Sequence, residues 1–234
     1  MPVNYMTNEV YHIDYEGLYE ELMEKSFLSD ARVQCEYVKL WISELRKRDV
    51  LEVEQFNDRE FRKLILQEKL EAPEMYSIEM NYKAGTIYIF FRVSRLIQAI
   101  GTISTDMIQY IGVQDFVMKN SYIKWDRTEL LNEIKRTPIL LAPMTIDEYV
   151  KLVVIDGNHR LTSWIDNKEK IPCCILDGQA IIDSNMLCSG FSKLMYIFQN
   201  EVVALATYTM RDKIDAMLLM NKIYFRTGKL LFEV

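Results

Sequence analysis

Residues 151–167 carry the sequence KLVVIDGNHRLTSWIDN, in which an apolar run is followed by a polar turn and a second apolar pattern. The run Lys151–Ile155 is rich in β-branched residues and predicts a strand. The stretch Leu161–Asn167 has apolar residues at helical spacing and predicts a helix. Gly157 lies between the two and allows the tight turn that a direct passage from strand to helix needs.

The turn residues Asp156, Gly157, Asn158, His159 and Arg160 suit the binding of an anion. The first N–H groups of a helix have no partner within that helix, and the positive end of the helix dipole lies beside them. Such a helix end favours phosphate, to which His159 and Arg160 add hydrogen-bond donors. Asp156 ends the strand and can hold a metal, a ribose or the loop itself.

A plainer interpretation fits the same five residues. Asp156-Gly157 is also a common turn, Asn158 is a common helix cap, and Arg160 can pair with a surface carboxylate. The residues alone do not separate these two interpretations.

Short strands alternate with short helices on both sides of the turn, which is typical of an α/β unit. The expected strands are 113–117, 139–141, 151–155 and 171–176, and the expected helices are 127–135 and 161–167. The tail predicts helices over 194–208 and 211–224 and a short strand over 229–234. Its apolar residues, among them Met195, Phe198, Met217 and Leu218, are expected to cover the sheet.

The first part of the chain has a different pattern. Residues 15–70 have helical periodicity and predict two or three helices, after which 76–93 alternate as a hairpin does and 95–110 return to a helical pattern. We therefore expect an α+β protein with a helical and hairpin region over 1–104 and an α/β region with C-terminal helices over 105–234. The absence of a Gly/Ser linker predicts a packed junction between them.

The stretch from about 110 to 176 resembles the ParB/sulfiredoxin-like superfamily. The resemblance is carried, in this order, by Ile111-Gly112-Val113-Gln114-Asp115-Phe116, Glu129-Leu130-Leu131-Asn132-Glu133-Ile134-Lys135, Pro138-Ile139-Leu140-Leu141, Val154-Ile155-Asp156-Gly157-Asn158-His159-Arg160-Leu161 and Ile171-Pro172-Cys173-Cys174-Ile175. In ParB proteins the turn is Gly-Glu-Arg-Arg and helps bind CTP, in sulfiredoxin it is Gly-Cys-His-Arg, and in the ADP-dependent serine kinases of this fold it is Asp-Gly-His-His-Arg.

The resemblance implies that Gly157, Asn158, His159 and Arg160 hold the phosphates of a nucleoside tri- or diphosphate. It implies an NTPase or a phosphotransferase that works with Mg²⁺, for which Asp156 is the candidate metal ligand. Asp156, His159, Glu129 and Glu133 are the candidate catalytic residues. Glu129 and Glu133 lie four apart on one predicted helix face, and a solvated acidic face is the alternative reading of them.

Departures from the family pattern argue against some of the functions found in this superfamily. Asn158 stands where sulfiredoxin has its reactive cysteine, which argues against sulfinic acid reduction. We find no clear helix-turn-helix with a basic recognition helix after residue 180. A DNA-associated protein or nuclease of a plasmid, phage or DNA-modification system remains an alternative, and so does a non-catalytic interaction module.

Composition sets further limits. A formal charge of −6 and a pI near 5.2 disfavour broad nucleic-acid binding. The four cysteines form no C-x-x-C pair, which predicts a reduced, cytoplasmic protein, and two histidines make a structural zinc site unlikely. The chain contains no apolar segment long enough for a membrane span. Residues 1–70 remain open as a substrate platform, a protein-binding surface or an element of self-association.

Overall fold

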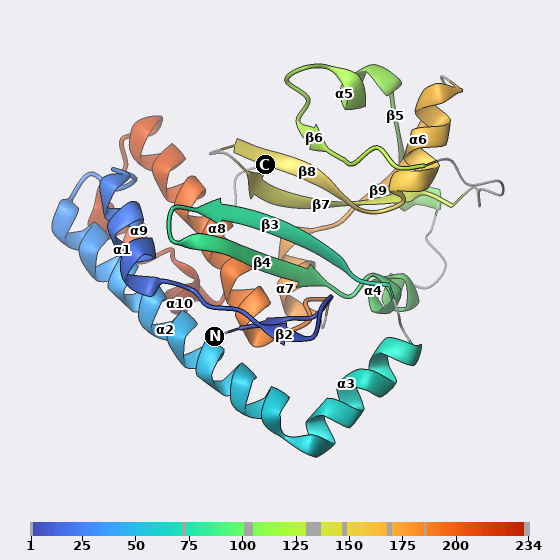
Figure 1. Ribbon diagram of the computed structural model, residues 1–234. Coiled ribbons are helices and arrows are strands. Elements are labelled where there is room, and N and C mark those ends of the chain that lie inside the picture. Colours follow the sequence, from blue (N-terminus) through green and yellow to red (C-terminus); the bar gives the residue numbers. More distant parts are fainter. Residues whose placement is uncertain are drawn as a thin grey trace.

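A computed structural model describes residues 2–71, 74–100, 105–129, 137–146, 149–167, 170–184 and 186–231. It is a mixed α+β structure, as the sequence predicts (Figure 1). The strands are β1 (Val3–Asn4), β2 (Glu9–Val10), β3 (Tyr76–Tyr82), β4 (Gly85–Phe91), β5 (Ile108–Ile111), β6 (Ile123–Lys124), β7 (Ile139–Ile146), β8 (Tyr149–Asp156) and β9 (Ile171–Ile175). The helices are α1 (Tyr15–Glu24), α2 (Ala31–Asn57), α3 (Arg59–Glu71), α4 (Val93–Ile100), α5 (Val113–Val117), α6 (Asn158–Asp166), α7 (Gly178–Asp183), α8 (Gly190–Met210), α9 (Ala216–Met220) and α10 (Tyr224–Thr227), with a 3-10 turn η1 at Thr105–Met107.

The largest sheet has the strand order β5-β9-β7-β8-β6. Strands β7 and β8 are antiparallel, as are β5 and β9, whereas β9 is parallel to β7 and β6 is parallel to β8. The predicted strands at 139–141, 151–155 and 171–176 are therefore confirmed as β7, β8 and β9. The predicted hairpin is confirmed as β3 and β4, which pair in a separate two-stranded sheet.

Several local predictions were wrong. Residues 113–117 form helix α5, for which Gly112 is the N-cap residue, and the strand of this region is β5, which ends before Gly112. Residues 211–224 are not one helix, because Lys213 has a φ of +52° and Asp215 starts α9 anew with a side-chain cap. Residues 127–129 and 229–231 have neither the helical nor the strand structure expected of them, and the remainder of each predicted element lies outside the described residues.

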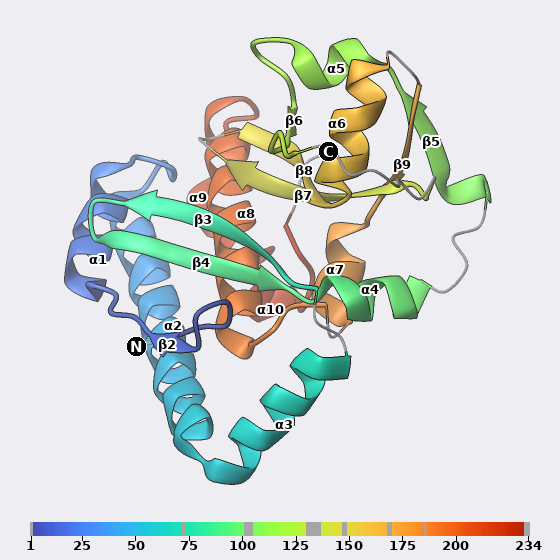
Figure 2. The same ribbon diagram turned by 45° about the vertical axis from the view of Figure 1, so that its right-hand side comes forward.

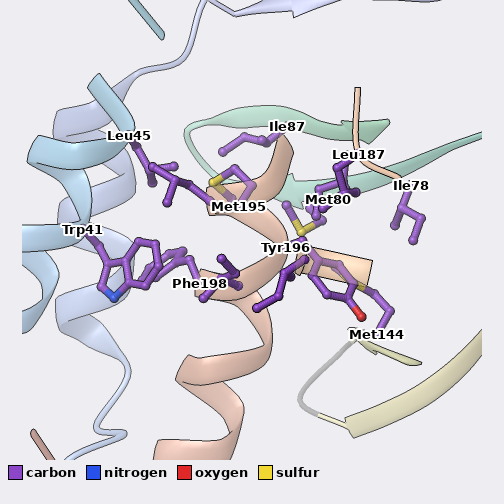
Figure 3. Packing of buried hydrophobic residues seen from close by; sticks show 14 of the residues in the cluster. Trp41, Leu45, Ile78, Met80, Ile87, Met144, Leu187, Met195, Tyr196 and Phe198 are labelled. Atoms are coloured by element: carbon purple, nitrogen blue, oxygen red, sulfur yellow. The ribbon is translucent and has the colours of Figure 1, made fainter. Parts of the chain in front are cut away.

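Helix α8 lies at the centre of the largest core cluster (Figures 1 and 3). Figure 3 shows Met195, Tyr196 and Phe198 of α8 among side chains from α2, the hairpin and β7. Its apolar residues occur on all sides of the helix, and a helix of this kind is stable only when it is covered all round. Met217 and Leu218 of α9 do not join the core as predicted, because their side chains are 64% and 60% exposed.

The opposite face of the five-stranded sheet carries α6 and α5. Leu161 and Trp164 of α6 and Phe116 of α5 pack with Val154 of β8 and Ile139 of β7. The main cluster joins residues from both 1–104 and 105–234, which agrees with a packed junction. No helix within the described ranges is long and apolar enough to cross a membrane.

Glu201 of α8 is a carboxylate with no solvent exposure. The Tyr37 hydroxyl and the Trp41 indole N–H donate to its Oε1 at 2.8 and 3.2 Å, and the backbone N–H of Tyr224 donates to its Oε2 at 2.6 Å. Desolvation raises the pKa of this carboxyl from 4.5 to about 7, although the three hydrogen bonds oppose the rise. Glu201 thus joins α2, α8 and the start of α10 at the cost of burying an ionisable group.

This burial predicts a pH dependence of stability. Between the unfolded pKa and the folded pKa, the native state binds more protons than the unfolded state, so the free energy of unfolding falls as the pH rises through this window. The loss approaches about 3 kcal/mol, or roughly 6–12 °C in Tm. We expect Glu201→Gln to remove most of this slope in thermal unfolding between pH 4.5 and pH 7.5. Burial also raises the pKa of Glu52, which lowers the free energy of unfolding with rising pH in the same direction. The contribution of Glu201 is therefore the difference in slope between Glu201→Gln and the wild type. Equal slopes in the two proteins would show that Glu201 does not cause the pH dependence.

Candidate functional site

The predicted strand, turn and helix around Gly157 are confirmed. Strand β8 ends at Asp156, and α6 begins at Asn158, with Gly157 as its N-cap residue at a φ of +103°. A Cβ on Gly157 would lie 2.6 Å from Cγ2 of Ile139 and 2.8 Å from Nη2 of Arg160. Glycine is therefore required here both by the backbone conformation and by the close approach of β7.

The N-terminus of α6 has no side-chain cap, because its N-cap residue is glycine. Asn158 is not the cap that the plainer interpretation assumed: it is the first helical residue, and its Oδ1 accepts from the backbone N–H of Asp126 at 3.1 Å. The first amides of α6 are among the helix-end donors that lack an intrahelical acceptor. The helix end thus offers donors and a positive dipole to an anion.

Arg160 faces inward from the turn. Its Nη2 donates to Asp156 Oδ2 at 2.6 Å and lies 3.3 Å from the carbonyl oxygen of Pro138. The two side chains are 17% and 19% exposed. This ion pair closes the turn from the side of β7, where Ile139 also lies, so Arg160 and Asp156 hold the turn in shape.

A short segment over 125–129, which we call the strap, crosses α6. The backbone N–H of Thr128 donates to Oγ1 of Thr162 at 3.2 Å, and the Thr162 hydroxyl donates to the carbonyl oxygen of Asn158 at 2.9 Å. Arg127 pairs with Asp166 at 2.6 Å near the other end of the helix. The strap is thereby fixed along α6 from its first turn to its last.

The strap also orients His159. The ring Nδ1 lies 3.0 Å from the carbonyl oxygen of Glu129. A carbonyl oxygen only accepts, so Nδ1 carries the hydrogen and Nε2 is left as the free ring nitrogen. His159 is exposed, and its Nε2 is available to a ligand at the helix end. A protonated ring would donate to that ligand from Nε2.

The candidate carboxylates occupy different settings. The Asp156 carboxylate is engaged by Arg160, and the Glu129 side chain is exposed beside His159, which its backbone contacts. Glu133 lies outside the described residues, so its expected place on one helix face with Glu129 stays a prediction. Residues 127–129 are not helical.

Sequence reasoning missed Asp126, Thr128 and Thr162. The strap falls where a helix was expected, so its backbone contacts with Asn158 and Thr162 had no signal in the sequence. The spacing of Asn158 and Thr162, four residues apart on α6, was the one visible hint, because a Thr hydroxyl can bond the carbonyl one turn earlier.

A metal held by protein side chains alone does not fit the described part of this site. Within the described ranges, no group of three or more His, Cys, Asp or Glu side chains is placed to hold a metal ion. Mg²⁺ in nucleotide sites is bound largely by phosphate oxygens and water with one or two carboxylates. The residues present fit a Mg²⁺ that arrives with a nucleotide, for which Asp126 and Glu129 supply exposed carboxylates and Asp156 a paired one.

Comparison of the chain with models of protein families, with curated proteins and with solved structures found no match. The ParB/sulfiredoxin-like resemblance therefore stays a prediction.

The close approach at Gly157 gives a matched pair of substitutions. Gly157→Ala adds a Cβ against Ile139 at a positive φ, which we expect to lower the free energy of unfolding by about 2–4 kcal/mol. Gly85 has a φ of +120° with nothing within 4 Å of the added Cβ, so Gly85→Ala carries the conformational strain alone and should cost about 1 kcal/mol. Urea denaturation of both variants measures the difference, and equal losses would show that β7 does not crowd the turn.

Proposed function

We propose that this protein binds a nucleotide by its phosphates at the N-terminus of α6 and hydrolyses it or transfers a phosphoryl group. The observation that carries the proposal is the uncapped N-terminus of a nine-residue helix, entered through Gly157 in the left-handed region, with exposed His159 beside the free amides. The solvent-facing side of the turn therefore has several hydrogen-bond donors, and the one carboxylate of the turn, that of Asp156, is not on this side.

The two sides of the turn support different roles. Ile139, Arg160 and the Asp156 carboxylate lie on the inward side, so a phosphate approaches from the side of the strap and His159. Phosphate oxygens accept from the first amides of α6, and Nε2 of His159 adds a donor when its ring is protonated. Arg160 supports the turn from behind, where its charge is balanced by the Asp156 carboxylate.

Turnover needs more than binding. Phosphoryl transfer depends on positioning, on neutralising phosphate charge and on a carboxylate that orients the nucleophile. Asp126 and Glu129 are the exposed carboxylates on the strap, which is fixed to α6 by backbone hydrogen bonds. Asp126 and Glu129 are therefore the candidates for the catalytic base, and they are the first residues to substitute. Mg²⁺ would neutralise phosphate charge when it binds with the nucleotide.

The binding proposal is tested by charge placed at the two ends of α6. We expect His159→Asp to weaken Mg²⁺-nucleotide binding at least about 30-fold, because a carboxylate beside the free amides repels phosphate. Asn167→Asp adds the same charge at the C-terminal end of the helix, roughly 12 Å away along its axis, and should change binding less than about threefold. Isothermal titration with ATP, ADP, CTP and GTP measures both variants.

The outcomes of this titration are distinct. No heat with any of the four nucleotides would overturn the proposal, and equal weakening by both variants would move the site away from this helix end. Binding without phosphate release in a turnover assay would leave a nucleotide-binding module and remove the enzymatic part. Retention of DNA in place of nucleotides would favour the DNA-associated alternative.

Arg160 provides a separate prediction. Arg160→Ala leaves the half-buried Asp156 carboxylate without its partner, so we expect a loss of about 1–3 kcal/mol in the free energy of unfolding. The double variant with Asp156→Ala should lose less than the sum of the single variants, by about 0.5–3 kcal/mol. If the Arg160→Ala variant is folded, it should still bind the nucleotide, but more weakly than the wild type does. Complete loss of binding in the folded variant would instead make Arg160 a direct phosphate ligand.

A further inference from the structure

The ring of His159 is held through one of its two nitrogen atoms. Its Nδ1 lies 3.0 Å from the carbonyl oxygen of Glu129 in the strap, and within the described part of the chain no hydrogen bond reaches its Nε2. A carbonyl oxygen accepts and does not donate, so the neutral ring carries its hydrogen on Nδ1 and a lone pair on Nε2. The strap thereby selects one of the two neutral forms of this histidine.

This selection decides what the neutral ring can bind. Phosphate oxygens only accept hydrogen bonds, and so does the lone pair on Nε2, so these two atoms repel each other. An unrestrained histidine can move its hydrogen to Nε2 and donate to an anion without gaining charge. In His159 that move would direct a lone pair on Nδ1 at the Glu129 carbonyl oxygen, 3.0 Å away. Only the doubly protonated ring can donate to the carbonyl oxygen and to a phosphate together.

The other charged groups of the turn and the strap do not replace this ring. They are Asp156 and Arg160 in the turn and Asp126, Arg127 and Glu129 in the strap. Arg160 is paired with Asp156 at 2.6 Å, and Arg127 is paired with Asp166 at 2.6 Å. The other two groups are exposed carboxylates, and nearby negative charge favours a protonated imidazole. Among the described residues of the turn and the strap, His159 is thus the side chain that can add positive charge without breaking an ion pair.

We propose that tight phosphate binding at this site requires the doubly protonated ring of His159, so that nucleotide affinity is coupled to the uptake of a proton. Histidine is the side chain whose charge changes at about pH 5–8. The affinity is therefore highest at the acid side of this range and falls as the pH rises through it, because the neutral ring must first take up a proton. This coupling rests on the proposed function, since it is a property of the same phosphate site.

NMR of the full chain with ¹⁵N-labelled histidine distinguishes the forms of the ring. The chain contains two histidines, and His12 is the internal reference. It lies between β2 and α1, which are apart from α6 in Figures 1 and 2. In the free protein at high pH, we expect the hydrogen of His159 on Nδ1. With Mg²⁺ and the tightest-binding of ATP, ADP, CTP and GTP, the titration midpoint of His159 should rise by at least about one pH unit, while that of His12 stays unchanged.

Isothermal titration at about pH 6 and about pH 8 measures the same coupling as a change in affinity. The amide nitrogen of a glutamine lies at about the place of Nε2 and donates at both pH values, so His159→Gln should bind without this proton uptake. We expect the wild type to lose at least about tenfold more affinity between the two pH values than His159→Gln loses. His12→Gln is the matched control and should keep the wild-type pH dependence. Ionisation of the nucleotide is the same in all three titrations and cancels in the comparison.

The outcomes separate this coupling from nucleotide binding itself. A hydrogen on Nε2 in the free protein overturns the coupling alone, and so does equal pH dependence of binding in the wild type and in His159→Gln. A titration midpoint of His159 that does not move when a nucleotide binds has the same meaning, and it decides the matter if His159→Gln does not bind or does not fold. No heat with any of the four nucleotides at either pH overturns the proposed function, and the coupling falls with it.

Discussion

Covering helix α8 is the constraint on which the rest of the structure depends. A helix with apolar residues on all sides cannot lie at a surface, and each large side chain that it buries contributes about 1.5–3 kcal/mol. Phe198 packs against Tyr37 and Trp41 of α2, whereas Tyr196 contacts Phe91 of the hairpin. The hairpin, the N-terminal helices and the five-stranded sheet are thereby held in one core by a single element.

Helix α8 also satisfies the polar groups of the strands around it. Strand β9 pairs with β7 over Ile139–Leu141, and beyond that point α8 approaches the edge of β7. There the Tyr196 hydroxyl donates to the carbonyl oxygen of Pro143 at 2.7 Å, and Asn200 Oδ1 accepts from the N–H of Thr145 at 2.8 Å. Buried backbone groups need such partners, so these two side chains allow β7 to extend into the core beyond the end of β9, with a strand, β8, on its other side only. The buried Glu201 does the same for the start of α10.

The candidate site lies on the opposite face of the same sheet, which gives it a rigid base. Strand β8 and helix α6 place Gly157 against β7, and the Asp156–Arg160 ion pair fixes the turn from inside. The strap then fixes the outer side through Asn158, His159 and Thr162. Fixed donors are the property that a phosphate site requires, because little has to be ordered when the ligand binds.

Local patterns in the sequence determined the elements whose own residues decide their structure. The alternating residues of β3, the runs of apolar strand formers in β4, β7 and β8, and the passage from Ile155 through Gly157 to Leu161 were predictable, because a strand pattern and a glycine turn are local properties. Only the tertiary structure decided the features that depend on distant residues. The inward direction of Arg160 depends on Ile139 and Pro138, and the ring orientation of His159 depends on the Glu129 carbonyl. Met195 of α8 and Met217 of α9 are likewise the same residue type in similar sequence patterns. Met195 is buried and Met217 is exposed, because α8 and not α9 lies between the sheet and α2.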